Sequence, residues 1–231
     1  MEIILDADGE DLVRDAHFDI AVPVHVETFH GETKIFAYPS VKSLCEDYAA
    51  AFANDLYGDA AIRYLQDGCA AFCSPLGYAP DRYCAVVGYN FLAPSGLTAE
   101  EDFCKRIRRA GKYENLTTFD LSACLAAERV IFAVVRDGAI VSLAVTCEAP
   151  TFGAFGEGGD RIEISVETAP DYRGHGYATA CVRALAAFLA ANGHGTLYKC
   201  RKENVASARV ARGAGLVQTG NFAYFVYRKN G

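Results

Sequence analysis

Apolar and polar residues follow two different periods within residues 161–192, and the change of period predicts two elements. Over residues 162–167 they alternate with a period of two, which is typical of a β-strand. Over residues 178–189 the apolar positions repeat every three or four residues, as on one face of a helix, and Asn192 and Gly193 end that pattern. We therefore expect a strand followed by a helix.

A turn that contains two glycines separates these elements. Pro170 ends the strand, because proline has no N–H to donate to a sheet. Residues 173–176 then read Arg-Gly-His-Gly. A strand, a glycine turn and a helix in this order place free backbone N–H groups at a helix N-terminus, where the helix dipole also favours a phosphate. Two glycines at this spacing also occur in ordinary turns, so the neighbouring residues must decide between the two interpretations.

The patterns from residue 81 onward predict an α/β (α+β) fold. Asp137 and Gly138 lie between two apolar runs, which is a strong signal for a β-hairpin. Residues 151–160 are rich in glycine and predict a loop. The predicted strands span residues 83–92, 130–135, 139–147, 162–167, 196–200 and 221–227, and the predicted helices span residues 98–110, 122–129, 177–191 and 205–212.

The preceding part of the chain predicts a small α/β extension, so we divide the protein into residues 1–80 and 81–231. The extension has predicted strands at 3–5, 22–29 and 33–38 and predicted helices at 43–57 and 60–72. Ser43 is a suitable N-cap for the first helix, and residues 74–80 are a candidate linker. The acidic residues within 6–11 lack the spacing of a calcium loop and indicate a solvated turn. We find no catalytic group of residues in this extension.

Composition and charge exclude several classes of protein. The 231 residues carry a formal net charge of -7, which argues against a nucleic-acid partner, and the basic residues within 105–112 are expected on a solvated helix face. The nine cysteines are scattered without zinc spacing, so we expect reduced thiols, a cytoplasmic location and no metal. The first residues do not resemble a signal peptide, and no apolar run is long enough for a bilayer, so we expect no membrane partner.

Two short motifs resemble the signatures of a known family. Arg173-x-x-Gly176-x-Ala178 is similar to the (Gln/Arg)-x-x-Gly-x-(Gly/Ala) signature of the GNAT superfamily of N-acetyltransferases. Asn204 and Ser207 open a predicted helix that looks like the second signature, most similar to members with Asn-x-Ala-Ser-x-x-Val-Ala. The resemblance implies the GNAT fold, a mixed and mostly antiparallel sheet with splayed central strands flanked by helices.

The resemblance also implies acetyl-CoA, or another acyl-CoA, as the donor cosubstrate. Its pyrophosphate would accept hydrogen bonds from the turn, where Gly174 and Gly176 would allow a close approach. Its pantetheine arm would pair with the strand backbone near residues 166–168 and bond to the Asn204 side chain. The residues expected to contact the donor are Val166, Thr168, Arg173, Gly174, His175, Gly176, Tyr177, Ala178, Thr179, Asn204 and Ser207.

Acyl transfer to an amine needs a group that removes a proton from that amine. A lysine-like amine has a pKa near 10.4, so a carboxylate that takes its proton favours attack. The resemblance implies Glu163 as this base, with Glu167 on the same strand face in reserve. Many relatives carry a general-acid tyrosine where this chain has Ala211. The remaining candidates for protonating the leaving thiolate are Tyr172, Tyr198 and Tyr224.

The sequence thus predicts an enzyme that transfers an acetyl or other acyl group from coenzyme A to a primary amine of a small molecule or peptide. The net negative charge of the chain favours a cationic acceptor through long-range electrostatic steering. A module that binds or senses acyl-CoA with little or no turnover is the alternative, because Ala211 replaces the usual acid. A dinucleotide-binding enzyme is disfavoured, since the turn lacks a third glycine and a downstream acidic partner. The sequence leaves a homodimer open.

Overall fold

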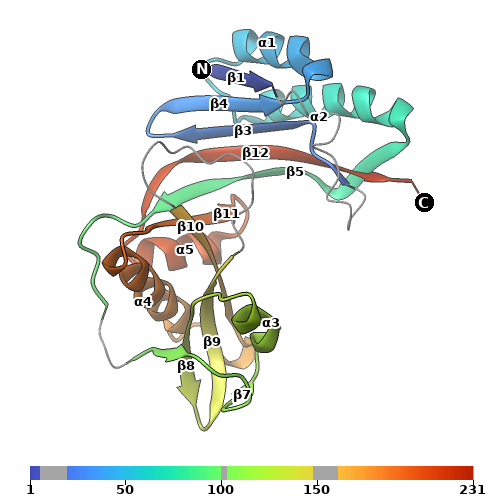
Figure 1. The fold of residues 1–231 in the computed structure, drawn as a ribbon. Coiled ribbons are helices and arrows are strands. Elements are labelled where there is room, and N and C mark those ends of the chain that lie inside the picture. The colour runs from blue at the N-terminus through green and yellow to red at the C-terminus, as the bar shows by residue number, and fades with distance from the viewer. Residues whose placement is uncertain (6–19, 100–102, 148–160, 231) are drawn as a thin grey trace. The chain divides into compact units, whose positions relative to one another are not determined.

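The chain folds into two units, which Figure 1 draws as a ribbon. The computed structural model describes residues 1–5, 20–99, 103–147 and 161–230. The first unit comprises Met1–Tyr89, Arg201–Glu203 and Thr219–Gly231, and the second comprises Asn90–Cys200 and Asn204–Gln218. Among the described residues, no helix has both the length and the apolar character needed to cross a bilayer.

The first unit contains a sheet in the order β1-β4-β3-β12-β5, with β2 beside β12. Its strands are β1 (Glu2–Leu5), β2 (Ile20–Ala21), β3 (Val24–Phe29), β4 (Glu32–Ala37), β5 (Tyr78–Leu92) and β12 (Val217–Lys229). β1 runs parallel to β4, whereas β3 is antiparallel to both β4 and β12. β3 and β4 confirm the predicted hairpin, and His30 and Gly31 connect them with positive φ angles of 48° and 85°.

Two helices cover one face of this sheet (Figure 1). They are α1 (Lys42–Ala51) and α2 (Asp59–Cys73), flanked by the short 3-10 turns η1 (Pro39–Val41) and η2 (Ser74–Leu76). Tyr48 of α1 and Leu65 of α2 are fully buried in the same core as Val26, Ile35 and Phe225 of the strands. The helix expected at 60–72 is therefore confirmed, because its apolar stripe faces the sheet.

The helix expected at 43–57 is shorter than the apolar pattern predicts. α1 ends at Ala51, yet Leu56 still packs against the same core, so the pattern reports burial beyond the end of the helix. The predicted N-cap at Ser43 is also wrong, because α1 continues directly from η1 and its N-cap is Val41. The linker expected at 74–80 is instead η2 followed by the start of β5 at Tyr78.

The second unit contains a mixed, mostly antiparallel sheet, as expected. Its order is β11-β10-β9-β8-β6, with β7 beside β9. The pairs β10–β11 and β7–β9 are parallel, and the pairs β9–β10, β8–β9 and β6–β8 are antiparallel. The strands are β6 (Lys105–Ile107), β7 (Glu114–Asn115), β8 (Ile131–Arg136), β9 (Ala139–Thr146), β10 (Arg161–Thr168) and β11 (Gly195–Arg201). The helices are α3 (Leu121–Ala126), α4 (Tyr177–Ala191) and α5 (Val205–Gly213), with the 3-10 turn η3 (Pro170–Tyr172) before α4.

Helices cover both faces of the strand β9, which explains why all eight of its residues are buried. α3 packs on one face through Leu121 and Cys124, against Ile140 and Leu143. α4 packs on the other face and contacts β8, β9 and β10 (Figure 1). The hairpin of β8 and β9 closes at Asp137-Gly138 with positive φ angles of 48° and 83°, which confirms the predicted turn.

The helix expected at 98–110 is wrong where the structure describes it. Residues 105–107 form the edge strand β6, which pairs with β8 and buries Ile107. The guanidinium of Arg106 lies 4.4 Å from the centre of the Phe188 ring, so this basic residue covers an aromatic face and does not belong to a solvated helix. Residues 100–102, the glycine-rich loop at 151–160 and the acidic turn at 6–11 lie outside the described residues.

Candidate functional site

The strands β10 and β11 pair over a short distance only. The register of the pair joins Arg161 with Gly195, Ile162 with Thr196, and Glu163 with Leu197. On its other side β10 continues to pair with β9 from Ile164 to Thr168. The second half of β10 is therefore held on its β9 side, while its edge toward β11 lies beyond the three residue pairs that join these two strands. Backbone groups at such an edge can pair with an extended ligand.

The predicted glycine turn follows this half of β10 and leads into α4. Gly174 and Gly176 have φ angles of 81° and 77°, in the left-handed region where glycine has no steric cost. A Cβ at either position would meet no protein atom within 4 Å, so the turn itself requires these glycines for their φ angles. Arg173 Nε donates to the carbonyl of Thr168 over 3.3 Å, which ties the turn to the end of the strand.

The first turn of α4 has an uncapped N-terminus. Its N-cap is Gly176, which has no side chain to accept from the first N–H groups. Those N–H groups and the helix dipole together create a favourable place for an anion. This arrangement is the one that the sequence predicts for residues 173–176, and it is consistent with a pyrophosphate.

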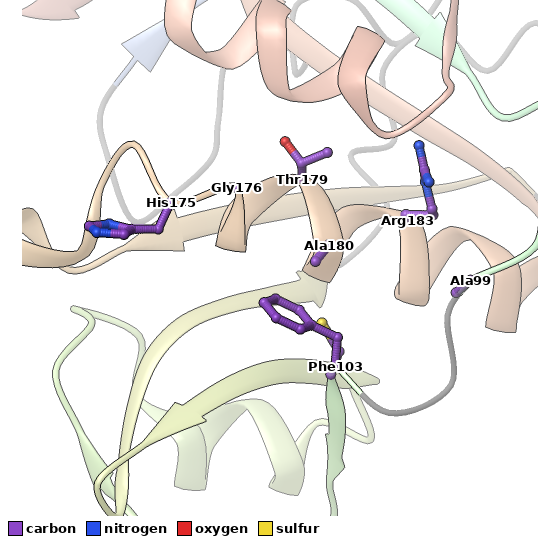
Figure 2. Close-up of a pocket in the computed structure, with 8 residues that line it drawn as sticks. Ala99, Phe103, His175, Gly176, Thr179, Ala180 and Arg183 are labelled. Carbon is purple, nitrogen blue, oxygen red and sulfur yellow. The ribbon is translucent and has the colours of Figure 1, made fainter.

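A cavity of about 230 Å³ lies beside this N-terminus. Figure 2 shows the Phe103 ring facing Ala180 in the first turns of α4, with His175 on the turn that precedes this helix. The lining residues are Ala99, Phe103, Cys104, His175, Gly176, Thr179, Ala180 and Arg183. One cavity is therefore lined by three of the residues expected to contact the acyl-CoA donor, namely His175, Gly176 and Thr179.

Arg183 brings a positive charge to this cavity. Its guanidinium donates to the carbonyls of Gly213 over 2.7 Å and Ala214 over 3.2 Å, which joins α4 to the end of α5. Arg183 is not among the residues predicted from the sequence, although it follows Thr179 by four residues on one helix face. Phe103 and Cys104 are not among them either, because they come from a distant segment and carry no local signal.

Tyr177 forms part of an aromatic group beside the cavity and is not among the residues that line it. Its ring stacks on His175 at 5.4 Å and lies 5.9 Å from Phe103. The guanidinium of Arg136 lies 5.3 Å from the centres of both the Tyr177 and the Phe103 rings. The His175 ring is exposed, and its Nδ1 lies 3.0 Å from the carbonyl oxygen of Arg173. These contacts hold Phe103 over the start of α4.

Glu163 and Glu167 lie on the same face of β10 but have different surroundings. The Oε2 atom of Glu163 is buried and has no hydrogen-bond partner among the described residues. Burial raises the pKa of the Glu163 carboxyl, and the nearby Lys199 ammonium opposes this shift. Glu167 Oε2 instead accepts from Thr118, over 3.1 Å from N and 2.7 Å from Oγ1. Glu163 is thus the more strongly desolvated of the two carboxylates.

Asn204 and Ser207 form the first turn of α5. Asn204 Oδ1 accepts from the N–H of Ser207 over 3.0 Å, so this side chain is the helix N-cap. Ser207 Oγ lies 2.7 Å from the hydroxyl of Tyr198, which is only 2% exposed. Burial raises the pKa of Tyr198, and the bond with Ser207 opposes this shift. Ala211 is completely buried one turn beyond Ser207.

The three candidate tyrosines are therefore in different settings. The Tyr198 hydroxyl contacts Ser207, which is expected to bind the acyl-CoA donor. Tyr172 instead lies in η3, and Tyr224 belongs to the first unit. In the part of the chain that the structure describes, no group of three or more His, Cys, Asp or Glu side chains could hold a metal ion.

Comparison with known proteins gives one family and a set of similar folds. A model of the family described as the acetyltransferase (GNAT) family matches residues 97–216. A protein assigned to the GNAT family from Novosphingobium aromaticivorans is 18% identical, with a TM-score of 0.54 over 67% of this chain and 69% of that chain. An acetyltransferase of the GNAT family from Colwellia psychrerythraea is 14% identical, with a TM-score of 0.50 over 84% of this chain and 76% of that chain. No curated protein sequence matches.

Proposed function

Because this chain belongs to the acetyltransferase (GNAT) family, we propose that it transfers an acetyl group from acetyl-CoA to a primary amine of a small molecule or peptide. The observation that carries the proposal is the position of the uncapped N-terminus of α4. It follows directly on the half of β10 that lies beyond the pairing with β11. A helix N-terminus suited to phosphate and a strand edge beyond the β10–β11 pairing are thus adjacent, as a long donor with a phosphate group and an amide-bearing arm requires.

The donor's pyrophosphate is placed, in this proposal, at the turn and the first turn of α4. Gly174 and Gly176 leave open space above the backbone, since a Cβ there would meet no protein atom within 4 Å. The N–H groups of Tyr177, Ala178 and Thr179 belong to the uncapped turn. The cavity and the charge of Arg183 support an anion at this place.

The donor's pantetheine arm is assigned to β10 and the start of α5. Val166 and Thr168 lie in the half of β10 that pairs with β9, beyond the three residues of β10 that pair with β11. The Asn204 side chain is exposed, and although its Oδ1 caps the helix, its amide nitrogen is a donor for a ligand carbonyl. Ser207 lies one turn further along the same helix face.

Glu163 is our choice for the general base. As the amine nitrogen attacks the thioester carbon, Glu163 takes one of its protons, and the C–S bond then breaks to release the thiolate of coenzyme A. A carboxyl whose pKa is raised by burial is a stronger base than an exposed one, which supports this role. Glu167 stays in reserve, since Thr118 already occupies one of its oxygens.

The departing thiolate needs a proton. Of the three tyrosines, we favour Tyr198, because its hydroxyl contacts Ser207 at the start of α5, where we place the donor's arm. In this scheme Ser207 donates its hydroxyl proton to the sulfur and receives one from Tyr198. Tyr198 would then act in place of the tyrosine that many relatives carry at the position of the buried Ala211.

The proposal extends to the charge of the acceptor, the cellular location and the division of the chain into domains. We propose a cationic acceptor, supported by the net charge of -7, and a protein of the cytoplasm, supported by nine free cysteines. We assign the transferase to residues 81–231, which include the matched segment, and an accessory role to residues 1–80. Within the family, we place the chain with members that carry Asn-x-Ala-Ser-x-x-Val-Ala.

Amine-dependent release of coenzyme A tests the proposed function. Purified protein is incubated with acetyl-CoA and a panel of amines and peptides, and both coenzyme A and acetylated product are quantified by mass spectrometry. We expect product with at least one amine and a large loss in Glu163→Gln. Tight binding of acetyl-CoA without turnover on a broad panel would favour the alternative, a module that senses acyl-CoA.

A further inference from the structure

Two cysteines that are 77 positions apart in the sequence meet at the wall of the cavity. The Sγ atom of Cys104 lies 3.9 Å from that of Cys181. Cys104 is half-buried and lines the cavity, whereas Cys181 is completely buried on the inner face of α4. The Sγ atom of Cys181 lies 3.6 Å from the carbonyl oxygen of Ser142 on β9. One thiol is thus open to a small reagent, and its neighbour is fixed behind it.

This pairing distinguishes the two residues from another half-buried cysteine of the unit. Cys147 lies 2.9 Å from the hydroxyl of Ser165, so its neighbour is an alcohol and not a second thiol. A disulfide has an S–S length of about 2.05 Å, so the sulfurs of Cys104 and Cys181 need to approach by roughly 2 Å. A change in the side-chain rotamer of Cys104 with a small shift of its segment can supply that approach.

We propose that Cys104 and Cys181 form a reversible disulfide site that takes a low-molecular-weight disulfide as its oxidant and regulates the donor cavity. Cys104 loses its proton to the solvent in the cavity and attacks one sulfur of the small disulfide, and the first small thiol leaves as a thiolate that takes up a proton from solvent. Cys181 then loses its proton and attacks the Cys104 sulfur, which releases the second small thiol. Two protein thiols and one small disulfide thus become one protein disulfide and two small thiols. The regulatory part rests on the proposed function, since it assumes that this cavity holds the donor.

Access to the cavity supports this order of events. Cys104 lines the cavity, whereas Cys181 is completely buried behind it, so a small disulfide meets the Cys104 sulfur first. The hydrogen bond that Cys104 donates to Cys181 raises the pKa of the Cys104 thiol, so its attack requires loss of that proton and is favoured as pH rises.

The new bond would change the shape of the cavity. Cys104 follows Phe103, whose ring is held against Tyr177 and the guanidinium of Arg136 at the start of α4. Closing the disulfide draws this segment toward the wall that carries Gly176 and Thr179. The cavity then narrows in front of the helix N-terminus, and a pyrophosphate loses contacts there.

The full-length protein is equilibrated with oxidised and reduced glutathione, alkylated, digested and mapped by mass spectrometry. We expect a cross-link between the Cys104 and Cys181 peptides that dithiothreitol reverses. Cys104→Ser and Cys181→Ser should remove this cross-link, and Cys147→Ser should retain it. A map without the cross-link, or with Cys104 joined only to glutathione, overturns the disulfide site.

Calorimetry with acetyl-CoA on the reduced and oxidised protein then tests the regulation. Oxidation should weaken binding by at least about tenfold, the scale of one lost charge-assisted hydrogen bond, and it should not change binding by Cys104→Ser, which lacks the attacking thiol. Unchanged affinity of the cross-linked protein overturns the regulatory role. A reduced protein that fails to bind acetyl-CoA contradicts the proposed function and the regulation together, whereas the cross-link is decided by the peptide map alone.

Discussion

Glu163 and Leu197 are the last residues that face each other in the register of β10 and β11. Glu163 therefore lies at the point where the paired part of the two strands ends, and its buried Oε2 has no hydrogen-bond partner among the described residues. The glycine turn and α4 follow at the far end of the same strand. One strand thus connects the proposed base with the proposed phosphate cradle.

Glu163→Gln should lower kcat by about 100-fold or more, the usual scale for loss of a general base. Acetyl-CoA affinity should stay within a few-fold of the wild type, because the amide keeps the size of the carboxyl. Glu167→Gln is the matched control on the same strand face, and it should retain most of the activity. Steady-state kinetics and calorimetry on the three proteins measure this, and equal losses in both variants would contradict the assignment.

The pH dependence of activity should report the same carboxyl. Because burial raises the pKa of Glu163 above the usual value of 4.5, the base form is lost as pH falls through the raised pKa. Thus kcat/KM should rise with pH along a limb that lies above pH 4.5, and Glu163→Gln should lack that limb. If the pH profile of Glu163→Gln keeps the acidic limb of the wild type, another group is responsible for that titration.

The same shift predicts a pH-dependent change in stability. A carboxyl with a raised pKa in the folded state holds its proton more tightly than in the unfolded chain, so folding is favoured at low pH and this contribution is lost as pH rises through the folded pKa. At neutral pH, Glu163→Gln should therefore have a higher Tm than the wild type, and the difference should shrink near pH 4. Calorimetric melts at both pH values measure it, and a Tm difference that does not depend on pH would count against the desolvation.

Gly176→Ala should weaken acetyl-CoA binding more than its cost in stability explains. An alanine in the left-handed region costs roughly 1–2 kcal/mol, and Gly176 has a φ of 77° with open space at its Cβ position. Gly193→Ala is the matched control, because Gly193 has a φ of 81° and equal space at the other end of α4. Both variants should lose similar stability in urea unfolding, but only Gly176→Ala should lose affinity. Equal affinities would remove Gly176 from the cradle.

Tyr198→Phe and Ser207→Ala should act through one shared step. Each removes one end of the 2.7 Å contact between the two hydroxyls, so each should lower kcat by at least about tenfold if the pair protonates the thiolate. The double variant should be no slower than the worse single variant, because the relay is already broken. Additive losses in kcat would indicate two separate roles. If Tyr198→Phe acetylates an acceptor amine with the kcat of the wild type, the relay is excluded.

Local patterns predict the central part of the fold because they follow from backbone chemistry. The period of two in β10, the glycines with positive φ and the apolar stripe of α4 lie within one continuous segment. Asp137-Gly138 closes its hairpin for the same reason, since both residues tolerate positive φ. At these places each element is determined by residues next to one another in the sequence.

The remaining features depend on partners that are distant in the sequence. Lys105–Ile107 becomes β6 because β8 offers an edge to pair with, which overrides a local helix pattern. The cavity brings Phe103 and Cys104 against α4, and no spacing along the chain indicates that meeting. The contact between Tyr198 and Ser207 likewise joins a strand to a helix, so the sequence alone could not rank the three tyrosines.

Calorimetric titration of the reduced protein with acetyl-CoA, beside Gly176→Glu and Gly193→Glu, tests the central claim most directly. Both variants place a carboxylate at a positive φ at one end of α4, but only the first places it at the proposed phosphate cradle. We predict micromolar binding by the wild type and by Gly193→Glu, and none by Gly176→Glu. A folded wild type that does not bind acetyl-CoA, or a Gly176→Glu variant that binds it equally well, would contradict the proposal.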